Sequence, residues 1–398
     1  MQKTIRSTLT LTSVFVLLAL ITGTASAAPP SKAKWTVMVY ISGDNDLEPY
    51  VVSDIETELA FTGSTNDVQV VALADRGPGY DTSYNDWQTT EFFHVTRNMT
   101  ADLANADADW DAHHEDELDM GSPQTLIDFV TWTKAHYPAD HYALIFWGHG
   151  WNWHPGYLMK DDTTAITQPD DFTLDYEEEK AAILSLGFID VVGYDGCNMA
   201  SIEIFNLWHG HATAVTGSQE FVWNEGIQYD LVLKDLVAHP NWNANQLAIA
   251  ISQSASADRT WSAVAVDSRF DALITAVNNW SVALNNNLSM YRSKYDRAFN
   301  ATQSFWKAPM DKDLYDMADE IKRLVIDRNI QAKSQAVMDA VNTVILDEHH
   351  TNAYSGAHGI TIYHISKASQ KDSNYTYYQT LDFSLQTGWN EFLDAYAN

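Results

Sequence analysis

The sequence predicts an α/β fold with a mostly parallel central sheet, flanked by helices and followed by a mainly helical C-terminal addition. Short apolar runs rich in β-branched residues alternate with segments of helical periodicity over the first two thirds of the 398 residues. Such alternation is typical of parallel strands joined by helical crossovers. From about Asp267 to Leu346 the periodicity is mainly helical. With 45% hydrophobic and 12% aromatic residues, the chain can bury a large core.

The N-terminus has the features of a secretory signal peptide. Lys3 and Arg6 precede an apolar run from Leu9 to Ile21, and Ala25-Ser26-Ala27 fits an A-x-A cleavage site. The run is too short to span a bilayer comfortably, and no later stretch reaches the roughly 18 consecutive apolar residues of a membrane helix. We therefore expect residues 1–27 to be removed and the protein to be secreted, either extracellular or periplasmic.

The first half of the chain is expected to begin the sheet. Apolar runs predict strands at Trp35–Ile41 and Val68–Ala74, and a third near Glu91–Val95. Leu47–Leu59 has helical spacing with acidic residues in its first half. Ser122–His136 is amphipathic and carries a proline in its first turn, which favours a helix.

The second half continues the alternation around a long polar segment. The expected elements are a strand at Tyr142–Trp147, a loop at Trp151–Asp175, a helix at Tyr176–Leu186, a strand at Phe188–Asp195, a helix at Asn198–Trp208, a strand at His211–Gly217, a strand at His358–Ile365 and a final helix near Trp389–Tyr396. We divide the chain into a signal peptide (1–27), a catalytic domain (28–266) and a C-terminal region (267–398). The C-terminal region is expected to pack on the catalytic domain and to contain one further strand.

The charge of the chain excludes two classes of partner. The formal net charge is −30 at pH 7. Binding of nucleic acid or of an anionic membrane surface is therefore not expected. Such acidity favours cationic substrates, although solubility of an exported protein explains it more simply.

Cys197 is the only cysteine, so it cannot form an internal disulfide and is either a packed apolar residue or a reactive thiol. It follows the predicted strand that ends at Asp195, and His149 follows the strand that ends at Trp147. The carboxyl ends of parallel strands meet at one edge of a sheet, where ligands bind. A helix starting directly after Cys197 would lower the pKa of the thiol, and the imidazole would complete its activation. The backbone amides of Gly150 and Cys197 are candidate oxyanion-hole donors.

A buried, inert thiol is the commonest alternative for a lone cysteine. Histidine–glycine pairs are also unspecific, because the chain has three. His209-Gly210 resembles a helix end with a capping glycine, and His358-Gly359 precedes its strand instead of following it. Of the three histidines, only His149 comes after an apolar strand. It is selected as the catalytic candidate for its place at a strand end, and not for the glycine beside it.

Several longer phrases resemble the clostripain family of cysteine peptidases, which are related to the caspases, legumains, gingipains and separases. The matching phrases are Val37–Tyr40 with Asp44–Glu48, Leu126–Phe129, Tyr137–Asp140, Tyr142–Trp151, Asp190–Glu203, Gly217–Glu220 with Gly226–Tyr229, and Leu381–Phe383 with Gly388–Leu393. The resemblance implies a caspase-like α/β fold and a Cys–His dyad. Cys197 would be the nucleophile and His149 the base, or the proton donor to the leaving amine.

The resemblance also implies a preference for Arg or Lys before the cleaved bond, which requires an acidic pocket. Asp195 matches the family's Asp-x-Cys position and is the first candidate for its floor. A strand-end aspartate that caps the following helix is the alternative. Glu220 and Glu225 are weaker candidates, since carboxylates are abundant here.

Members of the family can mature by self-cleavage between the two catalytic residues. Lys160 is the only basic residue in the predicted loop Trp151–Asp175, so autoprocessing is expected after it. Lys180 is a weaker site because it lies within a predicted helix. The alternative is that the loop stays intact.

No cofactor is required by the sequence, but calcium is possible because some relatives depend on it. The run Asp44-Asn45-Asp46 is too short for a calcium-hand loop, and Asp44 is better explained as a turn and helix-cap residue. The pairs His113-His114 and His349-His350 lack zinc-ligand spacing. We therefore assign no metal ligands from the sequence.

The function predicted from these features is that of a secreted cysteine endopeptidase, a hydrolase acting on protein or peptide substrates. A catalytically silent caspase-like module that binds peptides is one alternative, and a peptide ligase with the same dyad is another. The presence of both His149 and Cys197 disfavours the silent module, which could have lost either residue.

Overall fold

The computed structural model describes residues 32–169, 172–256 and 259–398. The predicted signal peptide lies outside the described residues. The described chain from Lys32 onward forms one unit. Among the described helices, none is long and apolar enough to cross a membrane.

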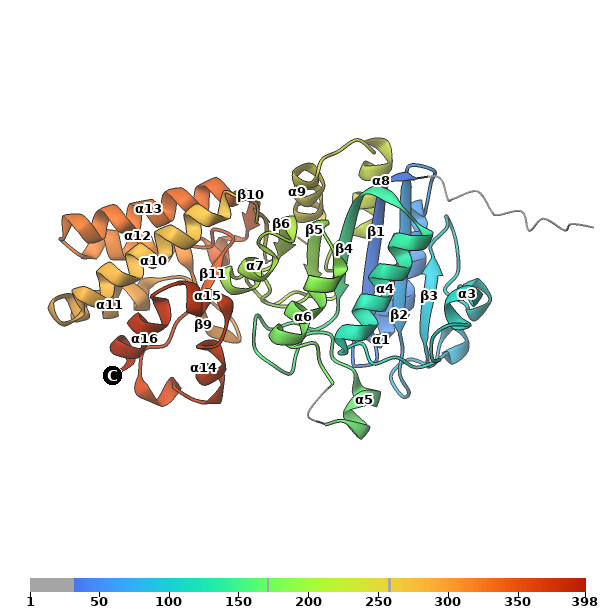
Figure 1. Ribbon diagram of the computed structural model, residues 1–398, viewed down its shortest axis with the longest axis horizontal. Helices are drawn as coiled ribbons and strands as arrows, with labels where there is room; N and C mark the ends of the chain where they lie inside the picture. Colours follow the sequence, from blue (N-terminus) through green and yellow to red (C-terminus); the bar gives the residue numbers. More distant parts are fainter. Residues whose placement is uncertain (1–31, 170–171, 257–258) are drawn as a thin grey trace, which may run out of the picture. The chain divides into compact units, whose positions relative to one another are not determined.

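The centre of the molecule is an eight-stranded sheet in the order β10-β7-β6-β5-β4-β1-β2-β3 (Figure 1). Its parallel strands are β1 (Ala33–Ser42), β2 (Val68–Asp75), β4 (Ala139–Trp147), β5 (Ile189–Asp195) and β6 (Ala212–Gly217). Antiparallel pairing adds β3 (Thr90–His94) at one edge and β7 (Thr260–Ala265) with β10 (Ile345–His350) at the other. The predicted mostly parallel α/β fold is therefore confirmed.

The parallel strands are buried on both faces, which explains why their sequences are apolar runs and do not alternate with polar residues. Along β1, Met38 and Tyr40 enter one core cluster, whereas Val37, Val39 and Ile41 enter the other. Successive side chains of a strand point to opposite faces, so each strand contributes to both cores.

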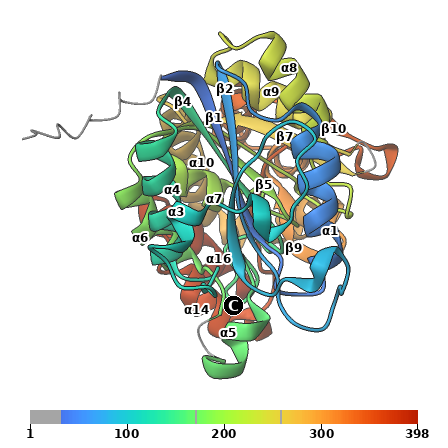
Figure 2. The same cartoon turned by 90° about the vertical axis from the view of Figure 1, so that its right-hand side faces the viewer.

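Helices cover the two faces of the sheet. The first core is covered by α4 (Pro123–His136), α6 (Tyr176–Leu186) and α7 (Ile202–Trp208). The second is covered by α1 (Glu48–Ser53), a π-helical segment (Asp54–Leu59), α2 (Ala60–Thr62), α8 (Tyr229–Ala238) and α9 (Ala244–Ser254). Figure 2 shows α4 and α6 on one side of the sheet and α1 on the other.

The C-terminal region is mainly helical but also contains a small antiparallel sheet. Its helices are α10 (Phe270–Asn286), α11 (Leu288–Ala301), α12 (Leu314–Leu324), α13 (Arg328–Val344), α14 (Ser373–Tyr378), α15 (Asp382–Gln386) and α16 (Trp389–Ala397). The small sheet has the order β11-β9-β8, with β8 at Ser304–Phe305, β9 at Ala308–Asp313 and β11 at Thr361–Tyr363. The predicted strand at His358–Ile365 therefore forms, but it pairs in the small sheet.

The predicted helix at Asn198–Trp208 starts later than expected. It begins at Ile202, and the hydroxyl of Ser201 caps it by accepting a hydrogen bond from the Ile204 amide at 3.2 Å. The four residues before Ser201 are held elsewhere, because the amides of Asn198 and Ala200 donate to the carbonyls of Glu220 and Ser218. Cys197 consequently lies in an extended turn and not at a helix N-terminus.

Two short helices are among the elements that were not predicted. The segment Trp151–Asp175 contains α5 (Asp162–Thr167), which is capped by Asp161. A second, α3 (Ala108–Asp111), lies in the irregular stretch between β3 and α4. Both begin after an aspartate whose carboxylate accepts hydrogen bonds from backbone amides of the first turn.

The C-terminal region supports the segment that follows Cys197. The Thr361 amide donates to the Ala200 carbonyl at 2.9 Å. The Tyr363 amide donates to Oε1 of Glu203 at 3.0 Å, and Trp389 Nε1 in turn donates to the Tyr363 carbonyl at 2.7 Å. Backbone and side-chain bonds thus tie the small sheet to the start of α7.

Candidate active site

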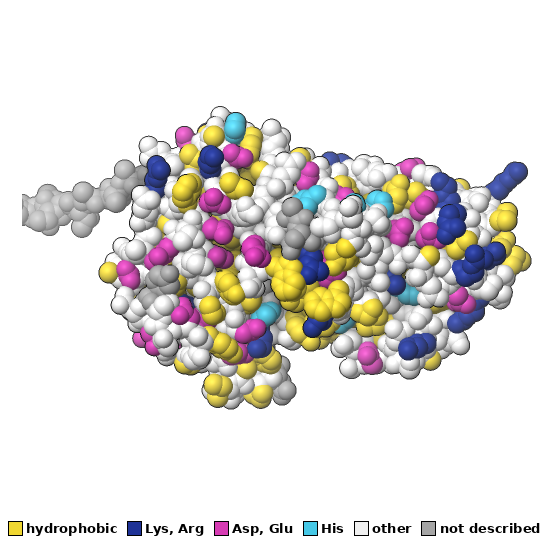
Figure 3. All heavy atoms as spheres, turned by 180° about the vertical axis from the view of Figure 1, so that it is seen from behind, with side chains coloured by type: hydrophobic (Ala, Val, Ile, Leu, Met, Phe, Trp, Pro, Cys, Tyr) yellow, Lys and Arg dark blue, Asp and Glu magenta, His cyan; other side chains and the backbone are white. Residues whose placement is uncertain are grey.

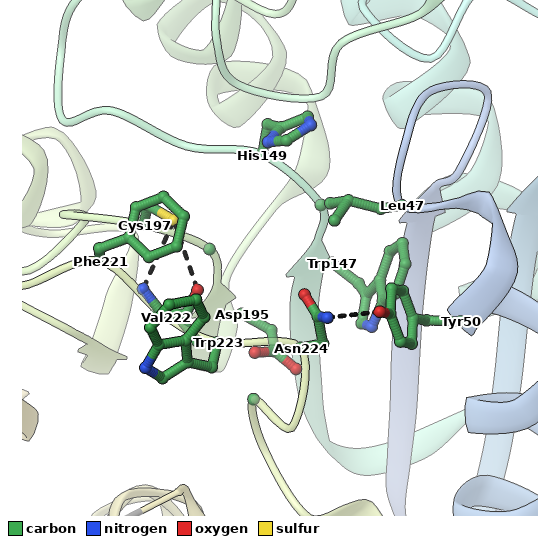
Figure 4. A pocket seen from close by; sticks show the side chains of 13 residues that line it. Leu47, Tyr50, Trp147, His149, Asp195, Cys197, Phe221, Val222, Trp223 and Asn224 are labelled. Carbon is green, nitrogen blue, oxygen red and sulfur yellow. Dashed lines mark hydrogen bonds between the residues drawn. The ribbon is translucent and has the colours of Figure 1, made fainter. Parts of the chain in front are cut away.

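His149 and Cys197 line the same pocket, at the carboxyl ends of two neighbouring strands (Figure 4). In the parallel pair β4–β5, Trp147 lies opposite Asp195, so the two predicted catalytic residues follow at the same edge of the sheet. The other lining residues come from the β1–α1 turn and from the segment after β6. The pocket therefore gathers residues from four separate parts of the chain.

Cys197 is half-buried, and its sulfur faces the backbone of Val222. The Val222 amide donates to Sγ at 3.4 Å, and Sγ lies 3.8 Å from the Val222 carbonyl oxygen. Burial raises the pKa of the Cys197 thiol to about 11, and the charges of Glu220 and Asp195 add to this. The expectation that a helix N-terminus lowers this pKa is wrong, because α7 starts only at Ile202.

The imidazole of His149 is oriented by Asp46, with Nε2 of His149 at 2.8 Å from Oδ1 of Asp46. Partial burial opposes ionisation of Asp46, but the hydrogen bond and charge of His149 outweigh it and lower the pKa of that carboxyl. Within the described chain, no hydrogen bond joins His149 to Cys197, and Figure 4 shows them on different sides of the pocket.

Asp46 was not identified as a site residue from the sequence. It lies in the turn after β1, and β1 pairs with β4 so that Ile41 is opposite Trp147. His149 and Cys197 were selected because each follows the carboxyl end of a parallel strand, and Asp46 follows such an end as well. The missing information was the order of the strands, which the sequence does not state.

Glycines let the His149 and Cys197 segments approach closely. A Cβ on Gly196 would lie 3.0 Å from the Gly148 carbonyl oxygen, and one on Gly150 would lie 3.0 Å from the Cys197 carbonyl oxygen. Among the described residues, neither the Gly150 amide nor the Cys197 amide donates a backbone hydrogen bond within the fold. Of these two residues, Cys197 lines the pocket and Gly150 does not.

Asp195 is buried and lines the pocket. Its carboxylate accepts hydrogen bonds from the Tyr229 hydroxyl at 2.8 Å and from the Ile227 amide. Burial raises the pKa of Asp195 to about 6. Asp195 does not cap α7, whose cap is Ser201. It instead fixes the start of α8, across the pocket from Cys197.

Two more carboxylates lie close to the same pocket wall. Oδ2 of Asp54 accepts a hydrogen bond from Nε1 of Trp147 at 2.8 Å, and Oε2 of Glu58 accepts one from the Tyr229 amide at 2.9 Å. Burial raises the pKa of Asp54 to about 8, with further contributions from Glu58 and Asp195. Burial and the charge of Asp195 also raise the pKa of Glu58 to about 7. These three carboxylates, which we call the acidic floor, repel one another and favour a cation.

The other predicted pocket residues, Glu220 and Glu225, do not line the pocket. Glu220 is fully buried, and its two oxygens accept hydrogen bonds from the amides of Phe221 and Trp306, each at 2.7 Å. Glu220 therefore supports the backbone of the rim. The rim itself is aromatic, since Phe221 and Trp223 line the pocket and the ring of Phe221 contacts those of Trp223 and Trp306.

Charge is unevenly distributed over the molecule. In Figure 3, Lys and Arg side chains gather towards the end formed by the C-terminal helices, whereas Asp and Glu side chains lie on both halves of this face. The net charge of −30 disfavours the approach of an anionic ligand.

Lys160, the predicted processing site, lies next to the β1–α1 turn. Its carbonyl oxygen accepts hydrogen bonds from Oγ of Ser42 at 2.8 Å and from Nδ2 of Asn45 at 2.9 Å. Its Nζ pairs with Asp162, and the side chain is 31% exposed. The peptide bond after Lys160 is therefore held against the end of β1.

One group of described side chains has the spacing of a metal site: Asp44, Asp75, Glu117 and Asp161. It lies outside the pocket, and the histidine pairs at positions 113 and 349 are not part of it. The prediction that Asp44 caps the helix following it is wrong, because α1 has no side-chain cap. Oδ2 of Asp44 instead accepts a hydrogen bond from the Thr163 amide, in the first turn of α5, at 2.8 Å.

Comparison with known proteins gives concordant matches. The model of the clostripain family matches residues 39–396. Clostripain of Hathewaya histolytica is 27% identical over 229 residues, which cover 52% of this chain and 42% of that protein. The match thus spans less than half of the length of that relative.

Two solved structures share the fold over 90% of this chain and 99% of their own. One is a secreted C11 cysteine protease from Bacteroides thetaiotaomicron in complex with an irreversible peptide inhibitor, with a TM-score of 0.67 and 16% identity. The other is an inactive zymogen C11 protease from Parabacteroides distasonis, with a TM-score of 0.64 and 17% identity. At sequence identities of 16% and 17%, the likeness to these two structures shows a shared fold and nothing finer.

Proposed function

Because this chain belongs to the clostripain family of cysteine peptidases, we propose that it hydrolyses peptide bonds with Cys197 as nucleophile and His149 as acid–base partner. The observation that carries the proposal is that both side chains line one pocket at the carboxyl ends of neighbouring parallel strands. Ligands bind at that edge of such sheets.

Two hydrogen bonds must break before the proposed reaction can begin: the one between the Cys197 sulfur and the Val222 amide, and the one between His149 and Asp46. The thiol proton passes to the imidazole, so the sulfur must leave the Val222 backbone and the imidazole must turn towards it. The thiolate then attacks the substrate carbonyl, and the amides of Gly150 and Cys197 stabilise the oxyanion. Collapse of the tetrahedral intermediate breaks the C–N bond, and the imidazolium protonates the leaving amine. Water hydrolyses the thioester and restores the thiol.

Cleavage after Arg or Lys is the proposed specificity. The acidic floor supports it, because the charges of Glu58 and Asp195 add to the burial that raises the pKa of Asp54, the charge of Asp195 does the same for Glu58, and a substrate cation relieves this repulsion. Of the three, Asp195 lines the pocket directly. Substrates are therefore proteins or peptides with a basic residue before the cleaved bond.

Self-processing after Lys160 is the proposed route of maturation. The residue is basic and its side chain is partly exposed, as a substrate residue must be. Its carbonyl must first lose the hydrogen bonds from Ser42 and Asn45. We therefore propose that opening of this segment precedes cleavage.

Secretion and a supporting role for the C-terminal region complete the proposal. Residues 1–27 have the signal-peptide pattern, and one solved relative is described as secreted. Residues 28–266 would form the catalytic domain, with residues 267–398 holding the nucleophile segment through the Thr361–Ala200 and Tyr363–Glu203 hydrogen bonds.

The test is turnover of fluorogenic peptides that carry Arg, Lys, Asp or Asn before the reporter, under reducing conditions. Hydrolysis of the Arg and Lys peptides is expected, with loss of at least about 1,000-fold in Cys197→Ala and His149→Ala. His209→Ala is the matched control and should retain activity, since His209 pairs with Asp271 outside the pocket. Turnover that survives Cys197→Ala would refute the mechanism. No turnover of any peptide would favour a binding module, and aminolysis that outpaces hydrolysis would favour a ligase.

A further inference from the structure

A polar cavity of about 290 Å³ lies in the C-terminal region. Its walls come from β9, from the segment that follows β11, from α11 and from α16. The cavity shares no lining residue with the pocket of His149 and Cys197. Its chemistry is therefore separate from that of the proposed active site.

Two basic side chains reach this cavity from one face of the small sheet. Lys312 lies opposite Ile362 in the antiparallel pair β9–β11, and the His364 amide continues the pairing by donating to the Met310 carbonyl at 2.8 Å. Because side chains alternate between the faces of a sheet, Lys312 and His364 point to the same side as diagonal neighbours. Such residues lie about 7–8 Å apart, which leaves room for a small ion with a hydrogen bond of about 3 Å on each side.

Lys312 is half-buried, and its charge has no partner in the described chain. Within the described residues, its Nζ forms no ion pair. Burial lowers the pKa of Lys312, and the charge of Asp316 offsets this only in part. A partly buried ammonium without a counterion is unfavourable, so the cavity beside it favours an anion.

His364 supplies a second nitrogen without a partner. The residue is 4% exposed, and its ring contacts those of Phe299 and Tyr396 at centroid distances of 4.4 and 5.6 Å. Nε2 is buried and has no hydrogen-bond partner among the described residues. Burial lowers the pKa of His364 to about 3, and the charge of Lys312 adds to this, so the ring is neutral at pH 7. A neutral imidazole still carries one N–H and can donate a hydrogen bond to an anion.

The other polar side chains of the lining are compatible with an anion. Oε1 of Gln370 accepts a hydrogen bond from the Ser366 amide at 2.8 Å, which leaves the amide nitrogen of Gln370 to donate. Asp296 is the one acidic residue among those that line the cavity, and its Oδ1 accepts a hydrogen bond from the Tyr396 hydroxyl at 2.7 Å. Three side chains thus offer N–H donors, which suit an anion with several oxygens.

The charge around the cavity differs from that of the whole chain. Helix α11, which forms one wall, carries Arg292, Lys294 and Arg297 against the single acidic residue Asp296. Figure 3 shows Lys and Arg side chains gathered at this end of the molecule. At physiological ionic strength, exposed charges beyond about 8 Å are largely screened, so nearby charges count more for a bound ion than the net charge of −30.

We propose that Lys312 and His364 form the base of a binding site for a small oxyanion, either a carboxylate or a phosphate. The anion would bridge β9 and the end of β11. These two strands also support the segments around Cys197, because Asp313 of β9 accepts a hydrogen bond from Nε2 of Gln219 at 3.0 Å and Thr361 of β11 donates to Ala200. Binding would therefore stabilise the C-terminal region without entering the proposed active site.

The test measures binding and stability on the Cys197→Ala chain, which removes the proposed nucleophile. Acetate, citrate and phosphate are titrated separately at constant ionic strength, with chloride as the reference salt. At least one of them should raise the melting temperature by about 4 °C over chloride, at a concentration about 100-fold above its Kd. An effect of acetate or citrate alone would identify the ligand as a carboxylate, and an effect of phosphate alone would identify it as a phosphate.

Two variants and a matched control decide whether these residues bind the anion. Lys312→Met and His364→Phe should each weaken binding at least about 10-fold, because each removes one hydrogen bond to a charged ligand. Lys312→Met is expected to fold, since it removes a half-buried charge that has no partner among the described residues, and circular dichroism verifies this. Lys322→Met should keep the full effect, because Lys322 is an equally half-buried lysine whose Nζ donates to Gln335 outside the cavity.

The proposal is wrong if none of the three anions stabilises the parent chain more than chloride, as expected for a cavity that holds only water. It is also wrong if both ligand variants retain the full shift, which would show a general effect of the salts on the protein surface. An equal loss in Lys312→Met and Lys322→Met would likewise contradict it. Peptidase activity enters none of these measurements, so a failure of the proposed function would leave the result readable.

Discussion

Nε2 of His149 and Oδ1 of Asp46 lie 2.8 Å apart, and this contact joins the ends of two adjacent strands. An ionised carboxylate can only accept a hydrogen bond, so Nε2 is the donor and Nδ1 is the nitrogen left for other partners. Asp46 is therefore a positioning residue for the imidazole. It also decides which nitrogen can meet the thiol once the imidazole turns.

We expect Asp46→Ala to lower kcat about 10–100-fold while KM changes less than about twofold, because the imidazole loses its orientation and the pocket keeps its lining. Steady-state kinetics on an Arg peptide measure both parameters. Asp271→Ala provides the control, since Asp271 makes a similar contact with His209 at 2.9 Å outside the pocket. If Asp46→Ala changed KM alone, the positioning role would be wrong.

Protonation of the acidic floor should control recognition of basic substrates. Burial raises the pKa values of Asp195, Glu58 and Asp54 to about 6, 7 and 8, so their negative charge grows as the pH rises from 6 to 8. The KM for an Arg peptide should fall over this range. A citrulline peptide has the same shape without the charge, and its KM should stay constant. Equal pH profiles for the two peptides would exclude an electrostatic role for the acidic floor.

The hydrogen bonds to the Lys160 carbonyl should slow self-processing. Ser42→Ala removes one of them, and we expect cleavage after Lys160 to become about 3–10-fold faster. Gel electrophoresis and mass spectrometry of the fragments give the rate and the position. Lys160→Ala should abolish the cleavage, whereas Lys180→Ala should leave it unchanged. Cleavage that persists at the original rate in Lys160→Ala would assign the processing to another bond.

The ion pair of Arg76 with Glu48 should be important for stability. Nε of Arg76 lies 2.9 Å from Oε1 of Glu48, and both side chains are fully buried. Replacing Arg76 with Met leaves Glu48 as an uncompensated buried charge and should lower the free energy of unfolding by about 3–5 kcal/mol. Chemical denaturation measures the change. Arg323→Ala breaks the exposed pair with Glu320 and should cost less than about 1 kcal/mol. Similar losses in the two variants would contradict this ranking.

The sequence predicted the elements whose signals are local. The apolar run Trp35–Ile41 became β1, and Tyr176–Leu186 is a helix with the bounds expected. Strand-end position also selected His149 and Cys197, which line one pocket. Each of these inferences needs only neighbouring residues and the rule that parallel strands share an edge.

Features that depend on tertiary contacts were missed. The helix after Cys197 starts late because Asn198 and Ala200 bond to the segment Ser218–Glu220, which no local pattern reveals. The high pKa of Cys197 follows from burial of the thiol, which outweighs the opposing hydrogen bond from the Val222 amide. The four carboxylates around Asp161 come from distant positions, so their spacing in the sequence resembles no metal motif.

The hydrogen bond from Thr361 to Ala200 also has a consequence for timing. The two residues are 161 positions apart, and the chain is synthesised from its N-terminus. The segment that carries Cys197 therefore lacks its β11 support throughout most of translation. We expect the nucleophile to reach its working geometry only when nearly the whole polypeptide has been made. We therefore expect nascent chains that end before β11 to lack peptidase activity.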